Sequence, residues 1–350
     1  MKDIVAVWTK PRLVVLTAVC AAVYVAAMLP FKWMVVIPGL AEVRPATAFP
    51  IVFSLLFGPA GAWGSAFGNL VGDMLGGMFG IGSIFGFAGN FAYGYIPYKL
   101  WEAFFPGTTV EDELKAWEKR TSGARRPLRT GGLVLGWALL ALAALFAVGH
   151  LGGSLDLNYI FTWKIGERLL SDLAVLALLA GPLAVCGALL LFLFSPARLL
   201  FVILTASLAC AGTIAWGVEL IGWVPFPVLG IWLFTNNFTL AMLLAPPILL
   251  LLYPRAEKSL MLYTHLLDEE GRKKPGRAPA LGVVVVVFVL FVGGVVLSAS
   301  GMADLLKDVF GLEGPGFWSD LVAGGNDSYF FKGACFFPLI VLLFVLLLLL

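Results

Sequence analysis

Long apolar runs dominate the chain and alternate with short polar segments, as in proteins built from membrane-spanning helices. A helix rises 1.5 Å per residue, so about 20 apolar residues cross the roughly 30 Å hydrocarbon core of a bilayer. Residues 49–101 are also apolar but rich in glycine, and their length fits either two long spans or three short ones. The remaining runs carry few or no charges and are 13–30, 131–149, 172–194, 198–221, 232–253, 280–299 and 333–350.

The distribution of basic residues favours three spans in this glycine-rich region, near 49–65, 66–81 and 83–101. With three spans, the basic loops 102–130 and 254–279 lie on the same side as the basic N-terminal segment. Cytoplasmic loops are enriched in Lys and Arg, so this arrangement fits the positive-inside rule, whereas two spans would place the loops on opposite sides. The sequence therefore predicts an all-α, polytopic transmembrane bundle of about ten spans with both termini cytoplasmic. One of the short spans could instead be re-entrant.

The composition indicates an integral membrane protein, and the sequence lacks the common catalytic and metal-binding motifs. The chain has 350 residues, 61% of them hydrophobic, and a mean hydropathy of +0.98, which is typical of an integral membrane protein. We interpret 13–30 as a retained first span and not a signal peptide, because it is longer than a usual signal h-region. The four Cys residues lie in apolar runs without CxxC spacing, and neither a metalloprotease motif nor a Gly-Lys phosphate-binding loop occurs. We therefore expect no metal, no cofactor and no enzymatic activity.

Polar residues cluster where the chain enters the second span. Glu42 and Arg44 precede Pro45, and Asp73 follows within a glycine-rich apolar stretch. A lone carboxylate at membrane depth is costly, so Asp73 should be paired, protonated or facing water, with Arg44 as a candidate partner. Two interpretations stay open: Arg44 and Asp73 bind a ligand, or they form a structural pair and Glu42 with Arg44 is an interfacial charge pair.

Other polar groups recur at the same predicted depth. Asn69 and Asn90 follow glycines 21 residues apart, and interhelical hydrogen bonding is the simpler explanation for both. Glu219 ends the span 198–221 beside Trp216, and Asn236 begins the next span. An indole, a carboxylate and an amide would suit a planar, hydrogen-bonding ligand, although an interfacial aromatic belt would give the same pattern. The predicted topology places five of these polar residues on the outer side, which favours an outward-facing pocket: Glu42, Arg44, Asp73, Glu219 and Asn236. We assign these five, together with Asn69, Asn90 and Trp216, to substrate binding.

The first span carries a stripe of small residues, Ala18, Ala22 and Ala26, at helical spacing. Such a stripe lets another helix approach closely. It predicts either a docking face for a partner subunit or ordinary packing within the chain.

Residues 10–101 and 198–255 resemble the membrane-embedded S components of energy-coupling-factor transporters. The features that carry the resemblance are the alanine stripe, Val43-Arg44-Pro45, the Phe57-Gly58-Pro59 turn, Gly68-Asn69 with Asp73, and Pro225-Phe226-Pro227 followed by Asn236-Asn237, Pro246-Pro247 and Pro254-Arg255. The resemblance implies a six-span subunit that captures a vitamin-like micronutrient. A separate transmembrane coupling subunit and two ATPase subunits would supply the energy, and the alanine stripe would contact the coupling subunit.

The chain is longer than the usual six-span pattern. Residues 1–101 would form the first four core spans, and 102–197 an inserted cytoplasmic helix with two spans. Residues 198–255 would complete the core, and 256–350 would add a cytoplasmic loop, two further spans and an acidic outer loop. Two alternative functions remain: an ion-coupled secondary transporter using an intramembrane carboxylate, and a non-catalytic membrane scaffold.

Overall fold

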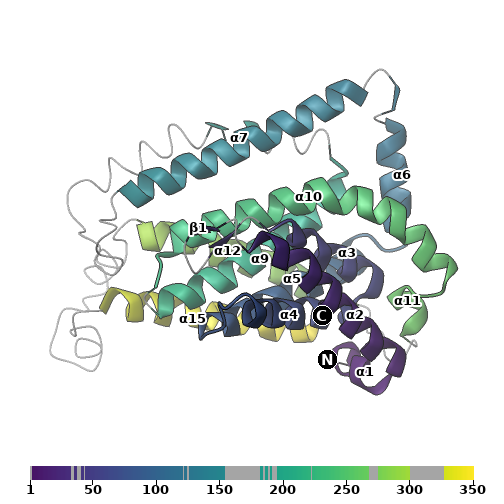
Figure 1. Cartoon of the computed structure of the whole chain (residues 1–350), viewed down its shortest axis with the longest axis horizontal. Coiled ribbons are helices and arrows are strands. Elements are labelled where there is room, and N and C mark those ends of the chain that lie inside the picture. The colour runs from purple at the N-terminus through teal and green to yellow at the C-terminus, as the bar shows by residue number, and fades with distance from the viewer. Residues whose placement is uncertain are drawn as a thin grey trace.

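A computed structural model of the chain shows an all-helical bundle with one small hairpin (Figure 1). The predicted span 172–194 and the acidic segment 300–332 lie largely outside the described residues. The structure describes residues 2–32, 35–37, 41–42, 44–120, 122–123, 126–153, 182–183, 186–187, 190, 195–221, 223–267, 275–299 and 327–350.

The N-terminal part consists of a short helix, a span and a hairpin. Helix α1 (Lys2–Thr9) precedes α2 (Pro11–Met28), which has proline in its first turn, where no backbone N–H is needed. After the 3₁₀ turn η1 (Leu29–Phe31), strands β1 (Val35–Ile37) and β2 (Ala41–Glu42) pair antiparallel, with Val35 opposite Glu42. The sequence pattern predicted only helices here, and this hairpin is an addition to it.

The glycine-rich region contains three helices, but the predicted boundary between its first two is wrong. The 3₁₀ turn η2 (Pro45–Thr47) leads into α3 (Ala48–Phe57), and the break comes at Gly58, not near residue 65. Gly58 has φ 55°, a conformation that favours glycine, and the following proline begins α4 (Pro59–Leu75). Helix α5 (Gly82–Phe104) follows after a tight turn.

Close glycine contacts set the directions of these helices. A Cβ atom on Gly64 would lie 2.4 Å from the Cβ of Cys20, and one on Gly68 would lie 2.8 Å from the Tyr24 ring. The contact passes from Cys20 to Tyr24 on α2 as it passes from Gly64 to Gly68 on α4, so the two helices run parallel. The chain must therefore cross back between them, and α3 makes this crossing. On α5 a Cβ at Gly94 would meet the backbone of Ala62, so α5 runs antiparallel to α4. This arrangement agrees with three crossings in 49–101.

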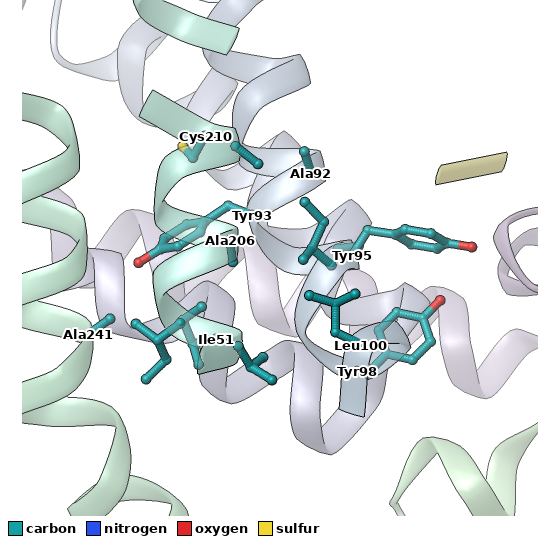
Figure 2. Packing of buried hydrophobic residues seen from close by; sticks show 14 of the residues in the cluster. Ile51, Ala92, Tyr93, Tyr95, Tyr98, Leu100, Ala206, Cys210 and Ala241 are labelled. Atoms are coloured by element: carbon teal, nitrogen blue, oxygen red, sulfur yellow. The ribbon is translucent and has the colours of Figure 1, made fainter. Parts of the chain in front are cut away.

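Helices α9 (Ala197–Leu220) and α10 (Phe226–Lys258) complete the central bundle by packing on α5, α3 and each other. Figure 2 shows Tyr93 and Tyr95 pointing to opposite sides of α5 within the core. The Tyr93 hydroxyl donates to the backbone oxygen of Asn237 on α10 at 3.1 Å.

The extra segments surround this core. Helix α6 (Val110–Arg120) lies in the segment where an inserted helix was expected, and α7 (Arg126–Gly153) packs on α10. Helix α11 (Tyr263–Leu266) follows α10, and α12 (Arg277–Ala299) and α15 (Asp327–Leu349) pair with each other beside α9.

Four described helical segments are long and apolar enough to cross a membrane, at Pro11–Phe31, Ala197–Leu220, Phe226–Leu266 and Arg277–Val295. The all-α membrane bundle predicted from the sequence is therefore confirmed.

A buried ion pair joins the two ends of the described chain, at the end of the bundle opposite the hairpin. Lys99 Nζ lies 2.6 Å from Asp3 Oδ2, and both side chains are almost fully buried. Lys99 also donates to the Leu350 backbone oxygen at 3.0 Å, while the Tyr98 hydroxyl donates to Asp3 at 2.9 Å. Burial raises the pKa of the Asp3 carboxyl, but the Lys99 ammonium and the Tyr98 hydroxyl act against it more strongly, so the pKa lies below its ordinary value.

Candidate functional site

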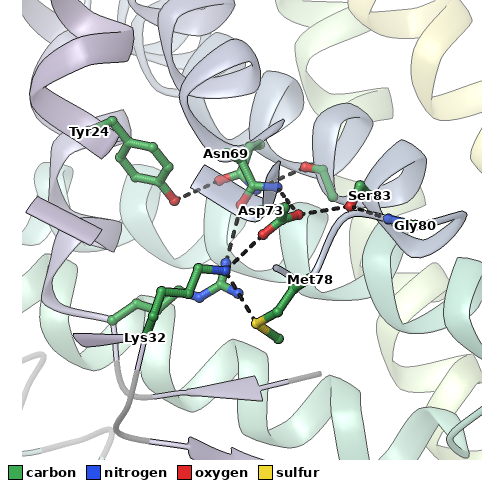
Figure 3. Close-up of polar contacts among 10 residues, drawn as sticks. Tyr24, Lys32, Asn69, Asp73, Met78, Gly80 and Ser83 are labelled. Carbon is green, nitrogen blue, oxygen red and sulfur yellow. Dashed lines mark hydrogen bonds and ion pairs between the residues drawn. The ribbon is translucent and has the colours of Figure 1, made fainter. Parts of the chain in front are cut away.

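The polar groups at the hairpin end of the bundle form one network around Asp73 (Figure 3). Lys32 Nζ donates to Asp73 Oδ1 at 3.0 Å as an ion pair. Asn69 Nδ2 and the Ser83 hydroxyl both donate to Asp73 Oδ2, at 3.2 and 3.1 Å. The carboxylate therefore receives three hydrogen bonds, from the turn after η1, from its own helix α4 and from α5, which offsets the cost of holding its charge at membrane depth.

Arg44 joins this network through Asn69. Its Nη1 donates to Asn69 Oδ1 at 3.2 Å, and its backbone N–H donates to Asn236 Oδ1 at 3.3 Å. Arg44 also caps the turn that leads into α3, because its carbonyl oxygen accepts hydrogen bonds from the Thr47 side chain and backbone. The guanidinium is thus held at the point where the chain enters the bundle.

Lys32 is a member of the network that the sequence reasoning missed. No motif in the sequence marks it as a site residue. A lysine just beyond the end of a span usually extends to the interface, which hides any other role. The available signal was Pro30, which ends the first span and leaves Lys32 within reach of the same polar end.

A small cavity lies inside the network. It has a volume of about 70 Å³, and its polar wall is formed by Arg44, Asn69, Asp73 and Ser83. Apolar side chains from α9 and α10 form the opposite wall, and the Trp223 indole, 37% exposed, lies at its edge. A water molecule occupies about 30 Å³ in the liquid, so an organic ligand needs more room than this conformation offers. Room can come from moving Lys32, since its ammonium group lies against the Asp73 carboxylate.

Glycines allow the helices to meet closely beside this cavity. A Cβ atom on Gly86 would lie 2.7 Å from Asn69 Nδ2 and 3.8 Å from Asp73 Oδ2. A larger residue there would displace the amide that links Arg44 to the carboxylate.

Asn90 lies one turn of α5 away from Gly86. Its Oδ1 accepts a hydrogen bond from the Tyr24 hydroxyl at 3.2 Å, and its Nδ2 donates to the Gly86 oxygen at 2.8 Å. These contacts tie α2 to α5 beneath the network.

Two residues of the wall expected on α9 and α10 are directed elsewhere. The Trp216 indole donates to the Leu290 oxygen at 3.1 Å and packs against Phe226, so it faces α12. Glu219 Oε2 accepts from the Phe226 backbone N–H at 2.8 Å, which caps the start of α10. Of the predicted wall, Asn236 contacts the network through the Arg44 backbone.

The remaining predicted residues lie apart from the cavity. Glu42 belongs to β2, and only its backbone is described. Ala18, Ala22 and Ala26 lie on the exposed face of α2, away from the glycines of α4.

The network can bind ligands through complementary hydrogen bonds. Arg44 and Lys32 are cations, Asp73 is an anion, and Asn69 and Ser83 can donate or accept, so the group combines both kinds of partner within one small volume. Within the described ranges no group of three or more His, Cys, Asp or Glu residues could hold a metal ion.

Residues 14–187, just under half of the chain, match the family model described as QueT transporter. The match includes α2 to α7 and ends before α9. It confirms the resemblance to S components of energy-coupling-factor transporters. No curated protein matches the chain, and no solved structure matches it.

Proposed function

From the premise that residues 14–187 belong to the QueT transporter family, we propose that the protein is a substrate-capturing membrane subunit. It takes up a small, vitamin-like organic micronutrient, and separate coupling and ATPase subunits supply the energy. The observation that carries the proposal is the network of Arg44, Asn69 and Asp73 around one cavity at the hairpin end. By the distribution of Lys and Arg, this end faces outward and both termini are cytoplasmic.

The ligand class follows from the donors and acceptors around the cavity. Arg44 offers a planar fork of donors, Asp73 offers acceptor oxygens, and Trp223 offers an aromatic face at the edge. A flat heterocycle with both donor and acceptor edges satisfies all three. A queuosine precursor, the cargo linked to this family, is the first compound to test.

Binding to purified protein tests the assignment. Titration calorimetry with a queuosine precursor should give a measurable affinity that falls about tenfold or more in Arg44→Ala and Asp73→Asn, since each loses a hydrogen bond to a charged group. Asp112→Asn is the matched control, because this carboxylate lies exposed on α6. Unchanged affinity in both site variants would exclude this cavity as the binding site, and mass spectrometry of retained ligand would then show what the protein carries.

The exposed alanine face of α2 is proposed to receive the coupling subunit. Ala18, Ala22 and Ala26 lie there in a stripe that no part of the described chain covers. Ala22→Trp should prevent copurification with the coupling and ATPase subunits while ligand binding by the isolated protein is kept. Val285→Trp, at an exposed position of α12, is the control. Copurification that survives Ala22→Trp would place the contact elsewhere, and uptake that depends on ion gradients instead of ATP would favour a secondary transporter.

A further inference from the structure

A second and larger cavity lies at the opposite end of the bundle. Its volume is about 400 Å³, against about 70 Å³ for the cavity beside Asp73. It is enclosed by the ends of α3 and α5, the turn that leads into α6, the last part of α10 and the segment that begins α11. This volume lies within the range of sites that hold small organic molecules.

Four aromatic side chains line this cavity: Trp101, Phe105, Tyr253 and Tyr263. Trp101 is held by a hydrogen bond from its indole Nε1 to the Thr108 oxygen at 2.8 Å. Tyr263 packs edge-on against Tyr98, with 5.2 Å between the ring centroids.

The Tyr263 ring also rests on the break between α3 and α4. A Cβ atom on Gly58 would lie 2.9 Å from this ring. The aromatic walls are therefore fixed by contacts within the chain before any ligand arrives.

Glu102 carries the only formal charge among the described residues that line the cavity. Three further carboxylates, on Glu111, Asp112 and Glu257, act electrostatically on Tyr253 in its wall. Glu111 is paired with Lys115, an exposed cation on α6. The interior therefore combines aromatic faces with negative charge.

This combination selects for positive organic groups. The faces of aromatic rings attract ammonium and guanidinium groups, and a carboxylate adds a charge-assisted hydrogen bond. An anionic ligand would be repelled by Glu102. A bare divalent cation such as calcium requires six or more oxygen ligands, which one carboxylate among aromatic rings does not supply.

We propose that this inner cavity binds an organic cation, an alkylammonium or alkylguanidinium group. The cation comes either from a free amine in the cytoplasm or from a Lys or Arg side chain of a protein docked at this end. The inner cavity shares no lining residue with the cavity beside Asp73, so cation binding there does not depend on which substrate is transported.

The test uses the purified full chain and two probes of nearly equal shape, butylguanidinium and neutral butylurea. Calorimetry should detect binding of butylguanidinium. Butylurea should bind at least about tenfold more weakly, because only the cation is attracted by the carboxylate and the ring faces. Glu102→Gln should remove this preference. Glu118→Gln, an exposed position on α6, should keep it.

A second variant tests the cavity separately, in case Glu102→Gln does not fold. Thr264→Trp, at a half-buried position of the wall, should fill the cavity and abolish butylguanidinium binding while thermal unfolding in detergent stays as in the wild type. A Gly-Gly-Arg-Gly-Gly amide, compared with the same peptide containing citrulline, distinguishes the sources. Binding of butylguanidinium indicates a site open to free amines, and binding of the arginine peptide alone indicates a partner's side chain. Equal binding of charged and neutral probes, or binding of neither cation, would overturn the proposal.

Discussion

Removing Lys32 tests how its ion pair with Asp73 affects ligand binding at the cavity beside Asp73. The two charged atoms are 3.0 Å apart, and their side chains are 9% and 10% exposed. At an effective dielectric constant near 20, Coulomb's law gives roughly 5.5 kcal/mol for such a pair. Desolvation of the two groups offsets most of this attraction. We take about 1.5 kcal/mol, the lower end of the net value of a hydrogen bond to a charged group, as the cost that a ligand must overcome to displace Lys32.

Lys32→Met keeps the length of the side chain and removes its charge. A ligand that donates to Asp73 then no longer has to break the ion pair, so its affinity should rise about tenfold. The empty protein should lose about 3 kcal/mol of stability, because the carboxylate is left without its cation. The rise in affinity and the loss of stability both come from removing the cation that pairs with Asp73, so the same variant should show both.

The assay is calorimetric titration of a queuosine precursor into wild-type and variant protein, with thermal unfolding in detergent alongside. Lys119→Met, at an exposed position on α6, controls for the loss of one positive charge. Weaker binding in Lys32→Met than in the wild type would refute the reasoning, because it would make Lys32 a contact for the ligand.

Three further predictions concern packing, charge and orientation. Gly64→Ala should cost about 1–3 kcal/mol in detergent unfolding, because its Cβ would lie 2.4 Å from the Cβ of Cys20; Gly131→Ala, with open space around it, should not destabilise the protein. Asp3→Asn should lower stability by about 3 kcal/mol at pH 7. Because the pKa of Asp3 is lowered in the folded protein, its contribution is present above the ordinary value, about 3.9, and is lost as the pH falls through the folded value. A stability difference from wild type that does not shrink as the pH is lowered from the ordinary value would contradict this. In a background without native cysteines, an impermeant maleimide should label Phe79→Cys from outside intact cells and His265→Cys only after lysis, and the reverse pattern would invert the orientation.

The sequence made Arg44 a candidate partner of Asp73, because isolated charge at membrane depth is costly. The structure links the two residues through Asn69, and the cation paired with Asp73 is Lys32. The sequence did not reveal the position of the break in the glycine-rich region. The predicted span 49–65 ran through Gly58-Pro59, although both residues favour a break, because hydropathy does not change there.

The direction of the Trp216 side chain is set by α12, a helix outside the six-span core that the sequence predicted. Hydropathy and spacing placed it at the outer end of α9, next to the expected pocket. Its indole faces α12, and nothing in the local sequence specifies which side of α9 that later helix covers. Trp223, in the following turn, lines the cavity instead.

The short length of α3 has an electrical consequence. Its 10 residues rise roughly 15 Å, about half the thickness of the hydrocarbon core, and Arg44 lies just before its first turn. Because a helix this short does not cross the hydrocarbon core by itself, we expect the cavity beside Arg44 to lie below the membrane surface, within the membrane field. If it lies about a third of the way across, a charged ligand moving into it would exchange roughly 0.8 kcal/mol with each 100 mV of membrane potential. Loading of the protein then becomes sensitive to voltage whenever the cargo is an ion, and is indifferent to voltage when the cargo is neutral.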